Sequence, residues 1–146
     1  RRRTSFAPMV AVAAMAAVMA LYMSATNIIG SISGQEISTD LNTLTPYMIF
    51  MLLIFNPIIE EFVFRKLFAD KLLKYGELFY ILVSSFCFAI VHGVSLGIPQ
   101  IVYTFILGMI WSYLVVKTGN IKLSIILHSL SNLFGSGLTS DNEYKN

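Results

Sequence analysis

"YMIFMLLIFNPIIEEFVFRKL", residues 47–67, begins as an apolar run and ends in a group of ionisable side chains. Its first part is apolar enough to enter a lipid bilayer, yet Glu60 and Glu61 stand side by side, and Arg65 follows Glu61 by four residues. Ionisable side chains within a spanning segment cost at least ~2.5–3.5 kcal/mol each on insertion scales, so they usually mark a functional site. The stretch therefore predicts a membrane helix that carries polar chemistry.

The composition of the 146-residue chain is that of a membrane protein, with 56% hydrophobic and only 12% charged residues. A soluble domain carries about twice that charged fraction. The apolar residues form long runs rather than amphipathic stripes, at 6–29, 47–68, 78–94, 100–116 and 121–134. These runs predict an all-α fold, a polytopic membrane helix bundle with about five transmembrane helices.

We expect one membrane domain, 1–146, with N-terminal spans in 1–55 and a polar tail at 135–146. A polar loop of turn formers is predicted at 30–46, a charged connection at 69–77 and a short turn at 95–99. In the turn KTGN (117–120), Gly119 is expected to cap one helix and Asn120 to begin the next. The chain begins with Arg1 rather than Met, so we expect it to be a fragment with upstream segments missing.

Loop charges predict how the bundle lies in the membrane, because Lys and Arg favour the cytoplasmic side. Arg1, Arg2 and Arg3 precede the first segment, and the loop 30–46 has neither Lys nor Arg. The next connection and its flanks are basic again, with Arg65, Lys66, Lys71 and Lys74. We therefore expect an integral membrane protein with a cytoplasmic N-terminus, and the short chain suggests a prokaryotic cell membrane.

Six polar side chains within the apolar segments form the candidate site: Glu60, Glu61, Arg65, His92, His128 and Asn132. Glu61 and Arg65 share one helix face, as do His128 and Asn132, because each pair is four residues apart. Glu60 is rotated by about 100° from Glu61. One carboxylate can then pair with Arg65 while the other does chemistry, and a histidine with an amide is suited to stabilising an oxyanion.

Two features bear on whether these side chains can meet. Pro57, three residues before Glu60, removes a helical hydrogen bond and predicts a kink that would help hold the carboxylates in a cavity. At ~1.5 Å per residue, Glu60 and His128 lie about 10–12 Å from the inner ends of their helices, whereas His92 falls nearer the outer side. The three can meet only if the helices tilt, kink or have other ends.

Purely structural interpretations remain for several residues. A buried ion pair alone would account for Glu61 and Arg65, and interhelical cross-linking for Asn132. Glu60 is harder to explain, because one arginine does not neutralise two acids. We expect packing or interfacial roles for Tyr103, Phe105 and Trp111, a close helix contact at Gly108, and a small buried hydrophobe in Cys87, the single cysteine, which excludes an intramolecular disulfide. The sequence has no basic patch interleaved with aromatic residues, so it does not indicate a nucleic-acid partner.

The same residues resemble a family signature. EEFVFR (60–65) resembles the EExxxR motif of the CPBP family, the CAAX prenyl protease and bacteriocin-processing (Abi-domain) membrane proteins. FAIVH (88–92) resembles its FxxxH motif and HSLSN (128–132) its HxxxN motif. The likeness covers 56–134, which we take as the motif-bearing core. Members of the family often have seven or eight spans, so the five expected here leave the completeness of the substrate groove open.

The resemblance implies an intramembrane endopeptidase, a hydrolase of the glutamic, metal-independent type without a cofactor. Glu60 would be the general base that activates water, with His92 assisting. The resemblance further implies membrane lipid and a peptide or membrane-tethered protein as partners. Prenyl-protein, peptide-pheromone or bacteriocin processing and self-immunity are the roles associated with the family, and the oligomeric state is left open.

The other motif residues also receive roles from the resemblance. Glu61 and Arg65 would form the pair that positions the base, and His128 with Asn132 would stabilise the oxyanion. Within the chain itself, no serine or cysteine is convincingly paired with a histidine and an acid, which disfavours covalent catalysis.

Two alternatives remain. In the first, Glu60, His92 and His128 bind zinc and leave a water position open, as in a zinc-dependent membrane protease. The HExxH spacing of common zinc proteases is absent, and Arg65 beside the acids disfavours a cation. In the second, the chain is a non-enzymatic membrane binder, for example a bacteriocin-immunity protein, and the motif residues serve only helix packing.

Overall fold

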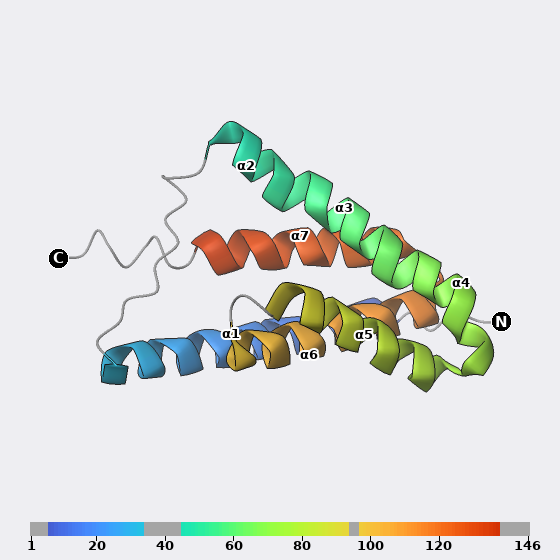
Figure 1. Ribbon diagram of the computed structural model, residues 1–146, viewed down its shortest axis with the longest axis horizontal. Helices are drawn as coiled ribbons and strands as arrows, with labels where there is room; N and C mark the ends of the chain where they lie inside the picture. The colour runs from blue at the N-terminus through green and yellow to red at the C-terminus, as the bar shows by residue number, and fades with distance from the viewer. Residues whose placement is uncertain (1–5, 34–44, 94–96, 138–146) are drawn as a thin grey trace.

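The computed structural model describes residues 6–33, 45–93 and 97–137. Within these ranges the chain is helical and has no β-strand, which confirms the predicted all-α fold. Five helical rods lie side by side (Figure 1): α1 (Ala7–Ser33), a continuous helix Pro46–Tyr75, α5 (Glu77–Gly93), α6 (Ile98–Thr118) and α7 (Ile121–Gly137).

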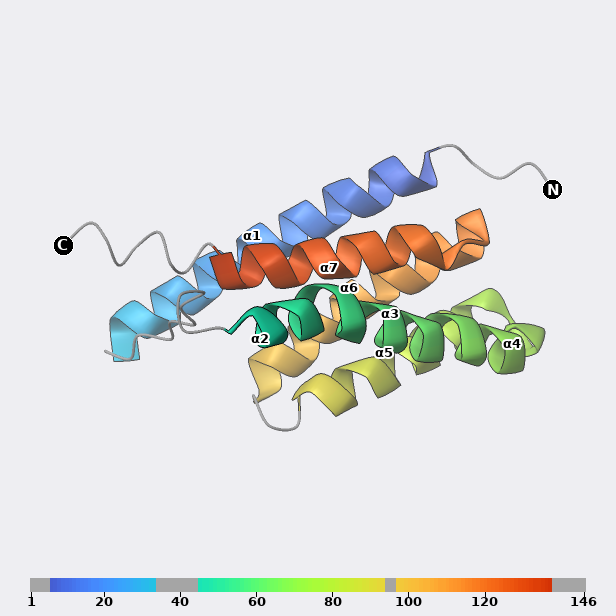
Figure 2. The ribbon, with the colours of Figure 1, turned by 90° about the horizontal axis from the view of Figure 1, so that it is seen from above.

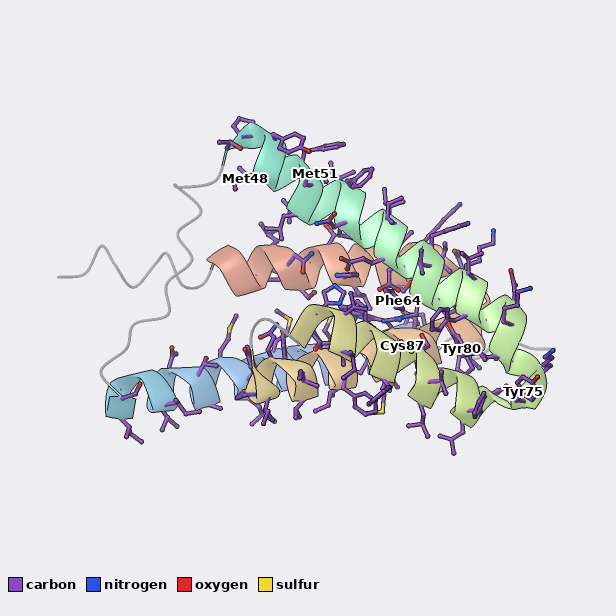
Figure 3. All side chains as sticks on the ribbon, in the orientation of Figure 1. Met48, Met51, Phe64, Tyr75, Tyr80 and Cys87 are labelled. Carbon is purple, nitrogen blue, oxygen red and sulfur yellow. The ribbon has the colours of Figure 1, made fainter. Side chains whose placement is uncertain are left out.

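The lengths and composition of the rods fit a membrane bundle. Three are long and apolar enough to cross a bilayer, namely Ala7–Ser33, Pro46–Tyr75 and Ile98–Thr118. The apolar helices Glu77–His92 and Ile121–Phe134 are shorter. Many large apolar side chains point outward, as Figure 3 shows for the whole bundle, and such a surface is suited to lipid rather than water.

The expected segment ends were partly wrong. The connection expected at 69–77 is mostly helical, because the second helix continues to Tyr75 and the chain reverses only at Gly76, where φ is 114°. The loop expected at 30–46 begins later, since α1 runs to Ser33. Parts of the expected loops and tail (34–44, 94–96 and 138–146) lie outside the described residues, as do Arg1, Arg2 and Arg3, on which the predicted orientation depends.

The turn between α6 and α7 was predicted correctly. Gly119 ends α6 in the left-handed region, with φ 66°, and its N–H donates to the Val115 carbonyl over 2.7 Å. The Asn120 side-chain oxygen accepts a bond of 2.8 Å from the Lys122 N–H, as expected of an N-cap.

The Pro46–Tyr75 helix changes its winding around the two glutamates. It consists of α2 (Pro46–Phe50), a π-helical turn η2 (Met51–Phe55), α3 (Asn56–Glu61), a second π-helical turn η3 (Phe62–Leu67), α4 (Phe68–Leu72) and a final 3₁₀ turn η4 (Leu73–Tyr75). The Asn56 N–H donates to the Met51 carbonyl, five residues back. The helix thus accommodates Pro57 through a wider, π-helical turn just before it. Turns of this kind occur frequently at functional sites.

Close packing of α5 on α6 fixes one side of the site. A Cβ atom added to Gly108 of α6 would lie 3.2 Å from the Ser85 Cα and 3.3 Å from the Phe88 ring of α5, so the expected close helix contact is confirmed. Trp111, of which 1% is exposed, packs in the core as expected, whereas Cys87 is only partly buried, contrary to expectation.

Helix α7 lies between the Pro46–Tyr75 helix and α1 in both views of the bundle (Figures 1 and 2). On the far side α1 packs against α6, where the Tyr22 hydroxyl donates to Gln100 and the ring stacks on Tyr103 with centroids 3.9 Å apart. Tyr103 therefore has the packing role expected of it. The arrangement brings α3, α5 and α7 around one buried polar cluster.

Candidate active site

Glu61 is held between Arg65 on its own helix and His128 on α7. Its Oε1 atom lies 3.0 Å from His128 Nδ1 and its Oε2 atom 3.2 Å from Arg65 Nε, and the side chains of both Glu61 and Arg65 are 0% exposed. The Glu61–Arg65 contact is an ion pair without hydrogen-bond alignment, since neither Oε2 nor Nε has a partner in bonding geometry. Charge attraction rather than a directed bond therefore joins these two residues.

The Arg65 guanidinium is fixed from α5. Its Nη1 atom donates to Ser84 Oγ over 3.2 Å, and Cζ lies 4.8 Å from the centroid of the Phe88 ring. The Tyr80 hydroxyl donates to the Arg65 carbonyl over 2.7 Å, at the contact between α5 and the Pro46–Tyr75 helix where Phe64 and Tyr80 are seen in Figure 3. These bonds lock η3 onto α5, so the position of the Arg65 charge is set by two helices.

Glu60 points to two imidazoles rather than to the arginine. Its Oε2 atom lies 3.0 Å from His92 Nε2 on α5 and 3.2 Å from His128 Nε2 on α7. A quarter of the Glu60 side chain (25%) is exposed, against none of Glu61. The two adjacent carboxylates therefore differ in both partners and access, and Glu60 is the one that a water molecule can reach.

Each imidazole is oriented by a second contact. His92 Nδ1 lies 2.7 Å from the Phe88 carbonyl, which can only accept, so Nδ1 carries a proton and Nε2 faces Glu60. His128 presents Nδ1 to Glu61 and Nε2 to Glu60. Its ring lies between the stacked indole of Trp111, 4.5 Å away, and the edge-on ring of Phe88 at 5.5 Å.

Asn132 lies one turn beyond His128 on α7 and contacts backbone. Its Nδ2 atom donates to the Leu52 carbonyl over 2.9 Å, and the neighbouring Ser129 hydroxyl donates to the Leu53 carbonyl over 2.6 Å. Both acceptors belong to the π-helical turn before Pro57. The structure thus joins five of the six candidate residues in direct contact and places Asn132 at the adjoining helix–helix contact.

Several residues of the cluster were not foreseen as part of it, namely Tyr80, Ser84, Trp111 and Ser129. A signal for two of them was available, because Tyr80, Ser84, Phe88 and His92 recur every fourth residue and so share one face of α5. Ser112 on α6 extends this face with a bond of 3.4 Å to Ser84 Oγ. Trp111 carried no comparable signal, since its contact with His128 joins different helices.

The three residues proposed as zinc ligands in the alternative, Glu60, His92 and His128, lie together but are not arranged around a metal position. Among residues 6–33, 45–93 and 97–137, no group of three or more His, Cys, Asp or Glu side chains is placed to hold a metal ion. Glu60 instead faces His92 and His128 directly, at 3.0 and 3.2 Å.

Comparison with known proteins shows which family the chain resembles. The model of the type II CAAX prenyl endopeptidase Rce1-like family matches residues 42–134, which include every candidate site residue. The membrane-embedded CAAX protease MroQ of Staphylococcus aureus (strain USA300) is 34% identical over 120 residues, covering 69% of this chain and 45% of the relative. The chain thus spans about half the length of that relative. No solved structure matches the chain significantly.

Proposed function

The chain belongs to the Rce1-like CAAX prenyl endopeptidase family, and from that premise we propose that it is an intramembrane endopeptidase in which Glu60 activates water. The observation that carries the proposal is the position of Glu60, partly exposed and 3.0 Å and 3.2 Å from two imidazoles. A base for peptide hydrolysis needs such access to water and partners that accept or donate protons.

In the proposed reaction, water adds to the carbonyl carbon of the scissile peptide bond and gives its proton to Glu60. The oxyanion formed on the carbonyl oxygen is stabilised by the Nε2–H of His128, with Asn132 one turn further along α7 as the second candidate donor. Glu60 then passes the proton to the amide nitrogen, the carbon–nitrogen bond breaks, and a carboxylic acid and an amine leave. His92 orients Glu60 and the water.

The charges of the cluster support this division of roles. With both imidazoles neutral, two carboxylates and one guanidinium leave a net negative charge in a mostly buried site, which a membrane interior disfavours. One further proton cancels that charge. On His92 Nε2 this proton makes the 3.0 Å contact with Glu60 a hydrogen bond, because Nδ1 already donates to the Phe88 carbonyl. A proton on His128, whose nitrogens both face carboxylates, supplies in addition the N–H that the oxyanion needs and leaves Glu60 ionised as the base.

Glu61 and Arg65 are proposed to position the reacting groups. Glu61 holds His128 Nδ1 at 3.0 Å, and Arg65 holds Glu61 while its own place is fixed by Ser84. With Nδ1 held, Nε2 of His128 faces the oxyanion site in a single orientation. Neither residue is proposed to exchange a proton with the substrate, since both are fully buried.

The proposed substrate is a peptide or a membrane-tethered protein, and the first candidate is a prenylated CAAX sequence, because the family and the Staphylococcus aureus relative carry that name. Peptide-pheromone and bacteriocin processing, or self-immunity, are the further candidates. We also propose that the end of the bundle with Lys66, Lys71, Lys74, Lys117 and Lys122 faces the cytoplasm of a prokaryotic cell.

The test uses the purified full chain in lipid nanodiscs and a farnesylated CAAX peptide with a fluorophore and quencher on either side of the scissile bond. Glu60→Gln should lower the cleavage rate by about 10²–10⁴, the usual contribution of a general base. Glu77→Gln is the matched control, because Glu77 is exposed and lies 3.8 Å from Lys117, away from the cluster. Full activity of Glu60→Gln would exclude Glu60 as the base.

If the wild type leaves that peptide intact, membrane peptides of cells that express wild type or Glu60→Gln are compared by mass spectrometry. Peptides that accumulate only with the wild type identify the substrate. Identical peptide sets in both cells would contradict the endopeptidase proposal and favour the non-enzymatic membrane binder.

A further inference from the structure

Pro57 removes one helical donor, which either of two backbone carbonyls could have used. In an α-helix the N–H of residue 57 would donate to the Leu53 carbonyl, and in a π-helical turn to that of Leu52. Proline has no N–H, so neither bond can form. The Asn56 N–H, the other helical donor within reach of Leu52, bonds instead to Met51. Unsatisfied carbonyls are costly in hydrocarbon, so other donors are required here.

Helix α7 supplies both replacements. The Ser129 hydroxyl donates to the Leu53 carbonyl over 2.6 Å, and Asn132 Nδ2 donates to the Leu52 carbonyl over 2.9 Å. Ser129 and Asn132 are three residues apart and so lie on one face of α7. The two bonds form a link between neighbouring turns of the same pair of helices that carry His128 and Glu60.

The direction of the Ser129 hydroxyl sets it apart from two other serines of α7. A serine in a membrane helix can satisfy its hydroxyl on a carbonyl of its own helix. Ser124 does so with Ile121 and Ser131 with His128, both over 2.7 Å. Ser129 donates to another helix, and its acceptor is the carbonyl that Pro57 leaves without its α-helical donor.

We infer that Ser129 is a positioning residue: by bonding the carbonyl exposed by Pro57, it sets the register between α3 and α7 and so holds His128 against both glutamates. Ser129 directly follows His128 in the chain, and Glu60 comes one turn after Pro57. A shift of α7 along α3 would therefore move the His128 contacts of 3.0 Å and 3.2 Å together. The catalytic part of this inference rests on the proposed function; the link between the helices does not.

The test is a double-mutant cycle of Pro57 and Ser129 in the full chain, assayed with the quenched peptide described above. Pro57→Ala restores an N–H that can satisfy the Leu53 carbonyl within the helix. With Pro57 in place, Ser129→Ala should therefore lower kcat about tenfold or more while KM is nearly unchanged, but in the Pro57→Ala background it should lower kcat only about twofold. Ser129→Thr keeps the hydroxyl and should restore most of kcat, and Ser124→Ala is the control that leaves kcat unchanged.

A second readout does not depend on activity. Thermal unfolding of the same variants in detergent should show that Ser129→Ala lowers Tm when Pro57 is present and changes it little in the Pro57→Ala background. If the wild type cleaves no peptide, the proposed function fails while this Tm cycle still decides the link. If Ser129→Ala does not fold, the double variant should recover folded protein.

Three results would overturn the inference. Equal losses of Tm in both backgrounds would mean that Ser129 does not serve the carbonyl left by Pro57. A loss of Tm that depends on Pro57, without any drop in kcat, would mean that the Ser129 bond stabilises the helix pair but does not position His128. A rise in KM at constant kcat would mean that Ser129 contributes to substrate binding instead. A double variant as unfolded as Ser129→Ala would likewise contradict it.

Discussion

The indole of Trp111 stacks on the imidazole of His128, with ring centroids 4.5 Å apart and 20° between the ring planes. Phe88 meets both rings edge-on, at 5.5 Å from His128 and 5.7 Å from Trp111. All three side chains are buried. The plane of the His128 ring is therefore set by aromatic packing, while its two nitrogens are aimed by the glutamates.

Trp111→Ala should remove the support of that plane. We expect a loss of about 3–5 kcal/mol in the free energy of unfolding from the cavity, and a fall in kcat of roughly 10² because the imidazole is no longer oriented. Trp111→Phe keeps an aromatic face and should retain most activity. Thermal unfolding and peptide cleavage measure the two effects, with the exposed Val102→Ala as control. Wild-type kcat in Trp111→Ala would show that the stack does not orient His128.

The buried ion pair makes a second prediction. Arg65→Ala leaves the Glu61 carboxylate without its cation in a fully buried place, and breaking such a pair costs about 3–5 kcal/mol. Arg65→Met with Glu61→Gln removes both charges and should recover much of the stability without restoring cleavage, since His128 Nδ1 then loses its carboxylate. Chemical unfolding in detergent measures the first effect and peptide cleavage the second.

An exposed ion pair provides the comparison for this prediction. Lys117 and Glu77 lie 3.8 Å apart with side chains 40% and 52% exposed, and Lys117→Ala should change stability by about 0–1 kcal/mol. If Arg65→Ala were as mild as Lys117→Ala, the charge of Glu61 would not depend on Arg65.

The helical spans and the motif faces could be predicted because they depend on local pattern. Long apolar runs determine the rods, and a spacing of four puts Glu61 with Arg65 and His128 near Asn132 on shared faces. The contact of His92 with Glu60 was harder to foresee. When the inner end of the helix was placed near Phe68, Glu60 and His92 came out at different depths in the membrane. The helix in fact runs to Tyr75, so Glu60 lies about 10 Å further from the inner end, at ~1.5 Å per residue.

Interhelical cross-linking was one interpretation of Asn132, but the backbone carbonyls that it and Ser129 bond could not be predicted. Pro57 indicated a lost hydrogen bond, and the structure shows π-helical turns on both sides of α3 with Ser129 and Asn132 on the exposed carbonyls. The sequence assigned Asn132 to an oxyanion site through its spacing from His128 and through the family resemblance, whereas its backbone bond depends on how α7 sits against α3. Such contacts are set by tertiary packing, which no spacing within one helix reveals.

Gly108 gives a third prediction, because it sits where α5 and α6 touch. A methyl group there would lie 3.2 Å from the Ser85 Cα, a backbone atom that cannot yield without moving α5. Gly108→Ala should therefore cost about 1–3 kcal/mol and lower kcat as His92 moves away from Glu60. Cleavage assays and thermal unfolding check this, and an unchanged kcat would show that α5 tolerates the shift.

Metal dependence is the last prediction, and it separates the glutamic mechanism from the zinc alternative. Glu60 contacts His92 and His128 directly, and Arg65 pairs with the adjacent Glu61, so we expect cleavage without a metal ion. Activity should then survive prolonged dialysis against a zinc chelator, and mass spectrometry should find much less than one zinc per chain. Loss of cleavage that only added Zn²⁺ restores, together with zinc binding that His92→Ala abolishes, would reverse this assignment and make Glu60 a ligand rather than a free base.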